Sequence, residues 1–258
     1  MINICLLSSK GGIGKSVIAI SIANNLSQDG HKVVLIDADP SSNTTSHFIE
    51  DLEDIENKTL RQVLKKEVVI RDVIVPIKPN LDFIPAEIEM RAIERELALH
   101  SNTHYFLYER LSEIKDDYDY CIIDTQGDLG FLPLSAYIAS EFVIMPTRLE
   151  KWSVRSIATI LNIVEAENDT KKYIEKQFKG FLVVPTMFES RTLTQKHFIN
   201  DIKKRYSDIM SKTVIHKAAE VEKTFAMDGS LLVDGTRTYD EYRQLTDEIK
   251  GVLNGKGN

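Results

Sequence analysis

Apolar runs alternate with amphipathic stretches along most of the chain. We expect buried strands over 2–7, 32–39, 81–85, 141–146 and 179–185, and one that ends at Asp124. The 3.6-residue repeats predict helices over 17–26, 60–66, 88–99, 105–114, 190–206 and 240–253. The polar stretch 41–46 is expected to be a loop, and the acidic run 50–56 a solvated face. This alternation predicts an α/β fold, a doubly wound and mostly parallel sheet flanked by helices, as one domain over 1–258.

A glycine-rich loop separates the first predicted strand from the first helix. Positions 8–16 read Ser-Ser-Lys-Gly-Gly-Ile-Gly-Lys-Ser. Without Cβ atoms, such a loop lets backbone N–H groups surround phosphates at the positive end of a helix. Lys15 would then pair with the β and γ phosphates, and the Ser16 hydroxyl would ligate Mg²⁺. The candidate nucleotide-binding residues here are Gly11, Gly12, Ile13, Gly14, Lys15, Ser16 and Val17.

The loop departs from the strict Walker A pattern, because Ser9 stands at its first glycine position and a second lysine, Lys10, follows. The alternative interpretation is an ordinary glycine-rich turn whose lysines serve solubility. The strand before it and the helix after it favour a phosphate-binding loop.

Carboxylates follow two of the predicted strands. Asp37 and Asp39 end the run over 32–39, and alternate residues of an extended chain point the same way. Ligands of open α/β sheets bind beyond the carboxyl ends of the strands, where both side chains would lie. Turn chemistry alone would also explain Asp39 followed by Pro40. Asp124 ends the strand in Tyr-Asp-Tyr-Cys-Ile-Ile-Asp (118–124), the Walker B pattern of a carboxylate in the Mg²⁺ shell.

Composition and charge narrow the class of protein. The 258 residues are 43% hydrophobic and 28% charged, which is ordinary for a globular protein. Cys5 and Cys121 fall in predicted buried strands without a second cysteine at metal or redox spacing, so both are expected to be core thiols. No apolar run has the length of a membrane span, and a cytoplasmic protein without membrane partners is expected.

The net charge of −7 is unevenly distributed. The segment 171–223 holds twelve Lys or Arg against six Asp or Glu, so it carries +6 and the rest of the chain −13. This asymmetry permits a basic face on an acidic protein, although most charge runs are solvated surfaces.

The Lys-Gly-Gly-x-Gly-Lys-Ser element (10–16) resembles the deviant Walker A loop of the ParA/MinD family of dimeric P-loop ATPases, and the resemblance covers nearly the whole chain. It implies that Lys10 reaches the partner's phosphates across a nucleotide-sandwich dimer. The resemblance also implies that the catalytic residues are Lys10, Lys15 and Asp39, and that Asp39 orients the attacking water. The residues that would hold Mg²⁺ are Ser16, Asp37 and Asp124.

Two further segments are similar to the family's nucleotide site. Pro185, Thr186 and Met187 resemble the segment that lines the adenine pocket, although a plain strand-end turn explains them equally well. Where the family has two prolines after its Walker B Asp-x, this chain has Gln126 and Gly127. Gly127 can still offer its N–H to the γ-phosphate and act as a hinge, so we expect a working switch of altered mobility.

By resemblance, the cofactors are ATP and Mg²⁺, and hydrolysis is slow and partner-stimulated. The ATP homodimer would bind DNA of the nucleoid without sequence preference, and a ParB-like or other adaptor protein would trigger its release. The function of this cycle would be to segregate a plasmid or chromosome or to position a protein assembly. The predicted DNA-binding residues are Arg191, Lys196, Lys203, Lys204, Arg205 and Lys217, whereas Glu220 replaces an arginine of the family. Because no long segment precedes the loop, we expect the short subtype without an N-terminal helix-turn-helix.

Two other functions compete with this one. A GTP-using switch is suggested by Asp124–Gly127, which spells Asp-x-x-Gly, but the sequence has no Asn-Lys-x-Asp element to bind guanine. A metabolic P-loop ligase of the dethiobiotin-synthetase type would use the same loop, but the sequence offers no separate set of substrate-binding residues.

Overall fold

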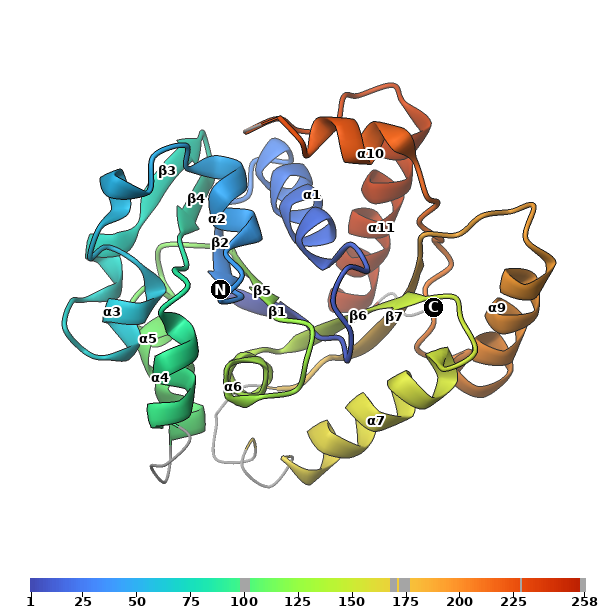
Figure 1. Cartoon of the computed structure of the whole chain (residues 1–258), viewed down its shortest axis with the longest axis horizontal. Coiled ribbons are helices and arrows are strands. Elements are labelled where there is room, and N and C mark those ends of the chain that lie inside the picture. The colour runs from blue at the N-terminus through green and yellow to red at the C-terminus, as the bar shows by residue number, and fades with distance from the viewer. Residues whose placement is uncertain (98–102, 168–170, 172–176, 228, 256–258) are drawn as a thin grey trace.

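A seven-stranded sheet forms the centre of the molecule, with strand order β3-β4-β2-β5-β1-β6-β7 (Figure 1). The structure is a computed structural model that describes residues 1–97, 103–167, 171, 177–227 and 229–255. Neighbouring strands are parallel except for β3, which pairs antiparallel with β4 at the edge. The strands are β1 (Ile2–Leu6), β2 (Val33–Ala38), β3 (Val75–Lys78), β4 (Leu81–Ile84), β5 (Tyr120–Thr125), β6 (Phe142–Arg148) and β7 (Gly180–Thr186).

Helices cover both faces of the sheet, as the apolar runs require (Figure 1). Alternate strand residues point to opposite faces: Ile4 and Leu6 pack in the layer under α1 (Lys15–Gln28) and α11 (Arg237–Leu253). Cys5 and Leu7 pack in the layer on the other face. That second layer contains α3 (Leu60–Leu64), α5 (Phe106–Ser112), α6 (Phe131–Ala139) and α7 (Ser153–Ala166).

The remaining described helices surround the sheet, and Met90, Ile93 and Ile202 from two of them are buried in that second layer. These helices are α2 (Asn43–Phe48), α4 (Met90–Leu97), α9 (Leu193–Tyr206) and α10 (Ala219–Thr224), with short 3₁₀ turns η1 (Leu52–Ile55), η2 (Ile70–Val73) and η3 (Thr103–Tyr105). No helix in the described ranges combines the length and apolarity needed to cross a membrane.

Strand register brings the carboxylates together. β5 lies between β2 and β1, and Asp124 is the register partner of both Asp37 and Leu6. The carboxyl ends of these three strands therefore meet at one point of the sheet edge, directly where the glycine-rich loop leaves β1. Asp37, Asp124 and the start of the glycine-rich loop thus lie together, as expected for strand ends of a doubly wound sheet.

The predicted elements agree with the structure at most positions, and the predicted fold class is confirmed. Cys5 and Cys121 are both buried in the core, as expected. The loop prediction for 41–46 is wrong in part, because α2 begins at Asn43 after Ser42 adopts a left-handed φ of 53°. The basic helix begins at Leu193 instead of 190, and α4 is described only to Leu97, so positions 98 and 99 lie outside the described residues.

Candidate functional site

The glycine-rich loop, residues Ser8–Gly14, joins the end of β1 to the first residue of α1. Gly12 and Gly14 have φ angles of 67° and 86°, in the left-handed region that favours glycine. The Ser8 hydroxyl donates to the carbonyl of Lys10 at 2.8 Å and closes the first turn of the loop. Lys15 begins α1 and is only 6% exposed. The unpaired N–H groups of the helix start and the buried ammonium together make a binding place for an anion.

Asp37 and Asp124 lie side by side at the bottom of this site, and both are fully buried. Asp37 Oδ1 accepts from the N–H of Asp39 at 3.0 Å. Its Oδ2 accepts from the backbone N–H of Thr45 at 2.9 Å and from the Thr45 hydroxyl at 2.8 Å. Asp124 Oδ2 accepts from the Thr44 hydroxyl at 2.8 Å. The first turn of α2 therefore fixes both carboxylates.

Burial is the main influence on the charge of these carboxylates. Desolvation raises the pKa of Asp37, and the neighbouring Asp124 raises it further. Desolvation also raises the pKa of Asp124, while Lys15, Ser16 and Thr44 act to lower it. Two adjacent buried carboxylates repel each other, so a divalent cation between them and the loop would relieve the repulsion.

Asp124 has the features of a magnesium ligand. Its Oδ1 is buried without a well-aligned hydrogen-bond partner in the described part of the chain, and the Ser16 hydroxyl lies close by. Mg²⁺ is commonly held by one or two carboxylates together with water and phosphate oxygens. The open oxygen of Asp124 and the hydroxyl of Ser16 fit that ligand set. Asp37, whose oxygens both accept hydrogen bonds, fits a supporting position.

Asp39 lies at the mouth of the same site and is 8% exposed. Its Oδ1 accepts from the N–H of Ser41 at 2.7 Å, which is the turn that the Asp-Pro sequence suggested. Asp39 also contributes to the field at Asp124 and raises the pKa of that carboxyl. It therefore combines a turn contact with a position beside the other two carboxylates.

Gly127 packs directly on the glycine-rich loop. A Cβ atom at this position would lie 2.4 Å from the nitrogen of Gly11 and 2.6 Å from the carbonyl carbon of Lys10. Only a residue without a side chain fits here while the segment after β5 rests on the loop. The contact explains the glycine sterically, whereas its predicted N–H contact with a γ-phosphate and its hinge motion stay predictions.

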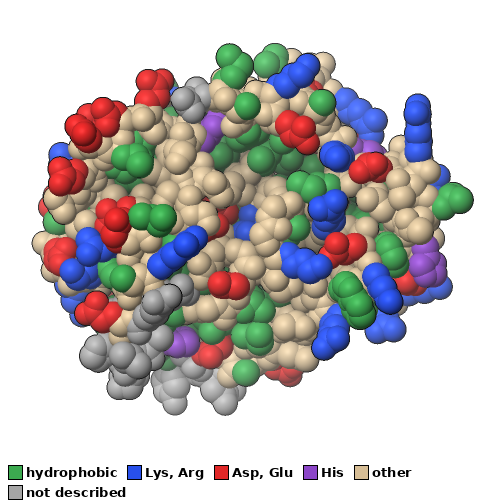
Figure 2. Space-filling view, in the orientation of Figure 1, with side chains coloured by type: hydrophobic (Ala, Val, Ile, Leu, Met, Phe, Trp, Pro, Cys, Tyr) green, Lys and Arg blue, Asp and Glu red, His purple; other side chains and the backbone are tan. Residues whose placement is uncertain are grey.

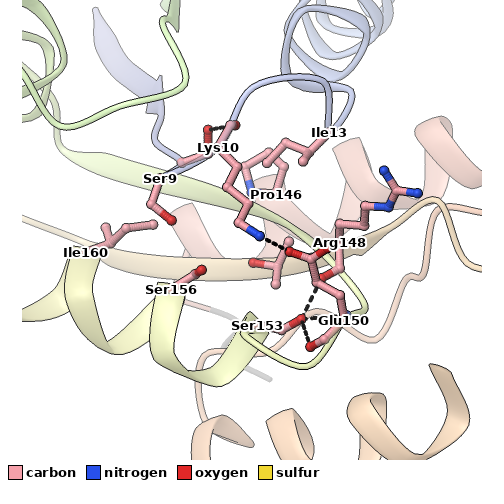
Figure 3. Close-up of a pocket in the computed structure, with 11 residues that line it drawn as sticks. Ser9, Lys10, Ile13, Pro146, Arg148, Glu150, Ser153, Ser156 and Ile160 are labelled. Atoms are coloured by element: carbon pink, nitrogen blue, oxygen red, sulfur yellow. Dashed lines mark hydrogen bonds and ion pairs between the residues drawn. The ribbon is translucent and has the colours of Figure 1, made fainter. Parts of the chain in front are cut away.

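The Lys10 side chain points toward the turn that follows β6 (Figure 3). Its Nζ forms an ion pair with Oε1 of Glu150, which lies between β6 and α7 (Figure 3). No motif or spacing connects these two residues, which are 140 positions apart in the sequence. Lys10, which the resemblance assigns to a partner's phosphates, is thus paired with a residue of its own chain.

A cavity of about 280 Å³ opens beside the loop. Thr186 and Met187, both predicted to be near a nucleobase, lie in its wall, whereas Pro185 does not appear in the lining. Pro185 instead accepts a backbone hydrogen bond from Ile215 at 2.9 Å, which attaches the 215–218 segment to β7. Further wall residues that sequence reasoning missed are Ile18, Ile215, His216, Ala218, Val221 and Tyr242.

The predicted DNA-binding residues fall into two groups. Lys196, Lys203, Lys204 and Arg205 belong to α9 and Arg191 precedes it, and all five are exposed. Lys and Arg side chains gather on this side of the molecule (Figure 2). Lys217 is also exposed but lies at the wall of the cavity, because its N–H bonds to the carbonyl of Phe188 at 3.1 Å.

Comparison with known proteins identifies the family. Residues 1–179 match the family model described as AAA domain. The chain is 31% identical over 213 residues to the sporulation initiation inhibitor protein Soj of Bacillus subtilis, covering 82% of this chain and 83% of Soj. It is 25% identical over 260 residues to a virulence plasmid ParA family protein of Chlamydia psittaci, covering 98% and 96%. The chain belongs to the ParA/MinD family of P-loop ATPases.

A solved structure agrees with this membership. A putative plasmid partition protein from Borrelia burgdorferi B31, bound to AMPPNP, superposes with a TM-score of 0.83 at 25% identity and covers 99% of both chains. The resemblance of the Lys10–Ser16 element to a ParA/MinD loop is therefore confirmed at the level of family and fold. Besides the cavity-wall residues named above, the motif did not indicate Thr44, Thr45 or Glu150.

Proposed function

We propose that this ParA-family protein binds MgATP, dimerises with the nucleotides between its subunits, and hydrolyses ATP slowly until a partner protein stimulates it. The observation that carries the proposal is the open, buried oxygen of Asp124 beside Lys15 and Ser16 at the start of α1. The AMPPNP bound to the Borrelia relative supports ATP as the nucleotide. The ATP dimer would bind DNA on the nucleoid and segregate or position a DNA or protein cargo through a ParB-like adaptor.

Each site residue has a distinct part in this function. Lys15 and the N–H groups of the loop bind the β and γ phosphates, and Ser16 and Asp124 hold Mg²⁺ with Asp37 in support. Bound Mg²⁺ would neutralise charge on the phosphate oxygens. Asp39 orients the attacking water, and Lys10 stabilises the partner's phosphates. The threonines of α2 keep the carboxylates in place, because each donates its hydroxyl to one of them.

The competing functions have less support. A GTPase would need a base-reading element, and the Asn-Lys pair at 57–58 is followed by Thr59 and Leu60. A metabolic ligase would need a second substrate site next to the γ-phosphate, and the sequence offers no separate set of residues for one. Measuring association by light scattering with AMPPNP or GTP, each with Mg²⁺, tests the proposal: association with AMPPNP only is expected, and its absence would refute the dimer.

Thr186→Val is expected to stabilise the nucleotide-free protein and weaken ATP binding. The Thr186 hydroxyl is buried without a partner among the described residues, and Thr186 is one of the residues that line the cavity. Such a hydroxyl destabilises the fold by about 1–3 kcal/mol, and a hydrogen bond from it to the base would change affinity by about two- to tenfold. Calorimetric titration with MgATP and thermal unfolding without nucleotide measure the two effects.

Thr246→Val is the matched control for this prediction. The Thr246 hydroxyl is also buried but is hydrogen-bonded to the carbonyl of Tyr242 at 2.9 Å and to Asn25 at 3.1 Å. Its removal should lower the melting temperature and leave ATP affinity unchanged. If Thr186→Val binds ATP as tightly as the wild type, the Thr186 hydroxyl does not contact the nucleotide.

Charge reversal on α9 is expected to abolish DNA binding by the ATP dimer. Lys203→Glu, Lys204→Glu and Arg205→Glu together replace three exposed cations by anions on each subunit. Because phosphate contacts act through counterion release, affinity at low salt should fall by about 100-fold or more. Wild-type binding should weaken steeply with added salt and show no preferred sequence. An electrophoretic shift assay with AMPPNP measures this.

A variant with the same change in net charge is the control for α9. Lys58→Glu, Arg91→Glu and Lys115→Glu alter three exposed basic residues outside that helix and should reduce binding far less. An equal loss in both variants would indicate a net-charge effect. If the wild-type dimer forms with AMPPNP but does not shift DNA, DNA is not the surface to which the dimer binds.

A further inference from the structure

The backbone of Lys10 is held on two sides, which leaves the side chain as its movable part. The Ser8 hydroxyl donates to the carbonyl of Lys10 at 2.8 Å. Gly127 lies against the peptide between Lys10 and Gly11, where a Cβ atom would come within 2.6 Å. The ammonium can therefore change partners only by rotating the side chain.

Glu150 is presented to Lys10 by a rigid turn (Figure 3). The N–H of Glu150 donates to the Ser153 hydroxyl at 2.8 Å. The Ser153 hydroxyl in turn donates to the carbonyl of Arg148 at 2.6 Å. Ser153 is 3% exposed and is the first residue of α7. The turn fixes the backbone of Glu150, so its carboxylate meets the ammonium at little further entropic cost.

We infer that Glu150 holds Lys10 in a resting position within its own subunit, and that each subunit must open this ion pair before Lys10 can reach its partner's phosphates. The inference rests on the proposed function, because it concerns the regulation of the same site. Glu150 acts on association through Lys10 and is a positioning residue. A triphosphate carries more negative charge than one carboxylate, so ATP on the partner can displace Glu150.

The exposure of Lys10 and Glu150 determines how strongly their ion pair opposes dimer association. The Lys10 and Glu150 side chains are 46% and 35% exposed, so water and salt screen their attraction. An exposed ion pair of this kind favours the paired position of Lys10 over the unpaired one by about two- to fivefold. A symmetric dimer opens two such pairs, and the factors multiply to about four- to 25-fold in the dimer dissociation constant.

Glu150→Gln tests the inference, because it removes the charge while keeping the size and the backbone turn. Glu165→Gln is the control, since Glu165 is an exposed carboxylate at the far end of α7. Sedimentation of the wild type and both variants with MgAMPPNP measures the dimer dissociation constant. We expect Glu150→Gln to associate about four- to 25-fold more tightly, and Glu165→Gln to match the wild type. Added salt should reduce the difference.

A second measurement needs no dimer. The rate at which an acylating reagent labels the Lys10 amine in the nucleotide-free protein, followed by mass spectrometry, should rise in Glu150→Gln and not in Glu165→Gln. Unchanged labelling refutes the resting position.

The two measurements also separate this inference from the proposed function. If the wild type associates with MgAMPPNP and Glu150→Gln associates equally or more weakly, the inference is wrong and the dimer stands. If the wild type does not associate, the proposed dimer is wrong, and the labelling rate still decides whether Glu150 restrains Lys10.

Discussion

Lys15→Ala should eliminate measurable MgATP binding and reduce turnover to background. Lys15 is 6% exposed at the start of α1, so its ammonium would meet the phosphates in a site largely shielded from water. Charge-assisted contacts of this kind are about twice as strong as neutral ones, and losing them should weaken affinity by about 100-fold or more. Isothermal titration with MgATP and steady-state phosphate release measure both effects.

Lys10→Ala is the informative comparison for this result. Its ammonium is paired with Glu150 on the surface of the protein, so monomer nucleotide binding should survive. Association with ATP and turnover should fall if the lysine acts across the dimer. Wild-type ATP affinity in Lys15→Ala would contradict the assignment of the loop, and wild-type association in Lys10→Ala would contradict the role in trans.

The parts of the site that could be predicted are those built from local pattern and strand direction. Ser8–Ser16 lies between an apolar run and a helical repeat, which fixes a strand-loop-helix unit whatever the remaining fold. Asp37 and Asp124 each end a buried run, and parallel strands place such ends together. These two rules locate the glycine-rich loop and the carboxylates without knowledge of strand order.

The parts that could not be predicted depend on contacts between distant segments. Thr44 and Thr45 reach the carboxylates only because α2 begins after Ser42 takes a left-handed φ, and the polar sequence there suggested a loop. The cavity wall forms because Ile215 pairs with Pro185. Glu150 reaches Lys10 because β6 lies next to β1 in the sheet. No spacing in the sequence encodes these pairings.

Lys217 illustrates the same difference. Motif resemblance grouped it with the basic residues of α9, but backbone pairing with Phe188 places it at the cavity wall. Its exposure leaves a DNA contact open, and that contact stays a prediction. The triple variant on α9 omits it, so a loss of DNA binding in that variant reports on one helix.

Asp39→Ala should leave a dimer that holds ATP without hydrolysing it. A residue that orients the attacking water acts mainly in the transition state, whereas the loop, Lys15 and Mg²⁺ bind the ground state. Loss of such a group should lower the hydrolysis rate by about 10²- to 10⁴-fold and change ATP affinity by only a few fold. Single-turnover hydrolysis of labelled ATP, with the dimer lifetime followed by light scattering, measures both.

Asp39→Asn distinguishes a role of Asp39 in ATP hydrolysis from its role in the turn with Ser41. The alanine also removes the acceptor for the N–H of Ser41, which Asp39 Oδ1 accepts at 2.7 Å, and the loss of that bond destabilises the turn by about 0.5–1.5 kcal/mol. Asparagine keeps a carbonyl oxygen at this position and removes the negative charge. If the carboxylate orients water, both variants should fail to hydrolyse ATP while the asparagine variant keeps wild-type stability. Normal single-turnover hydrolysis in Asp39→Asn, with loss only in Asp39→Ala, would mean that Asp39 serves the turn alone.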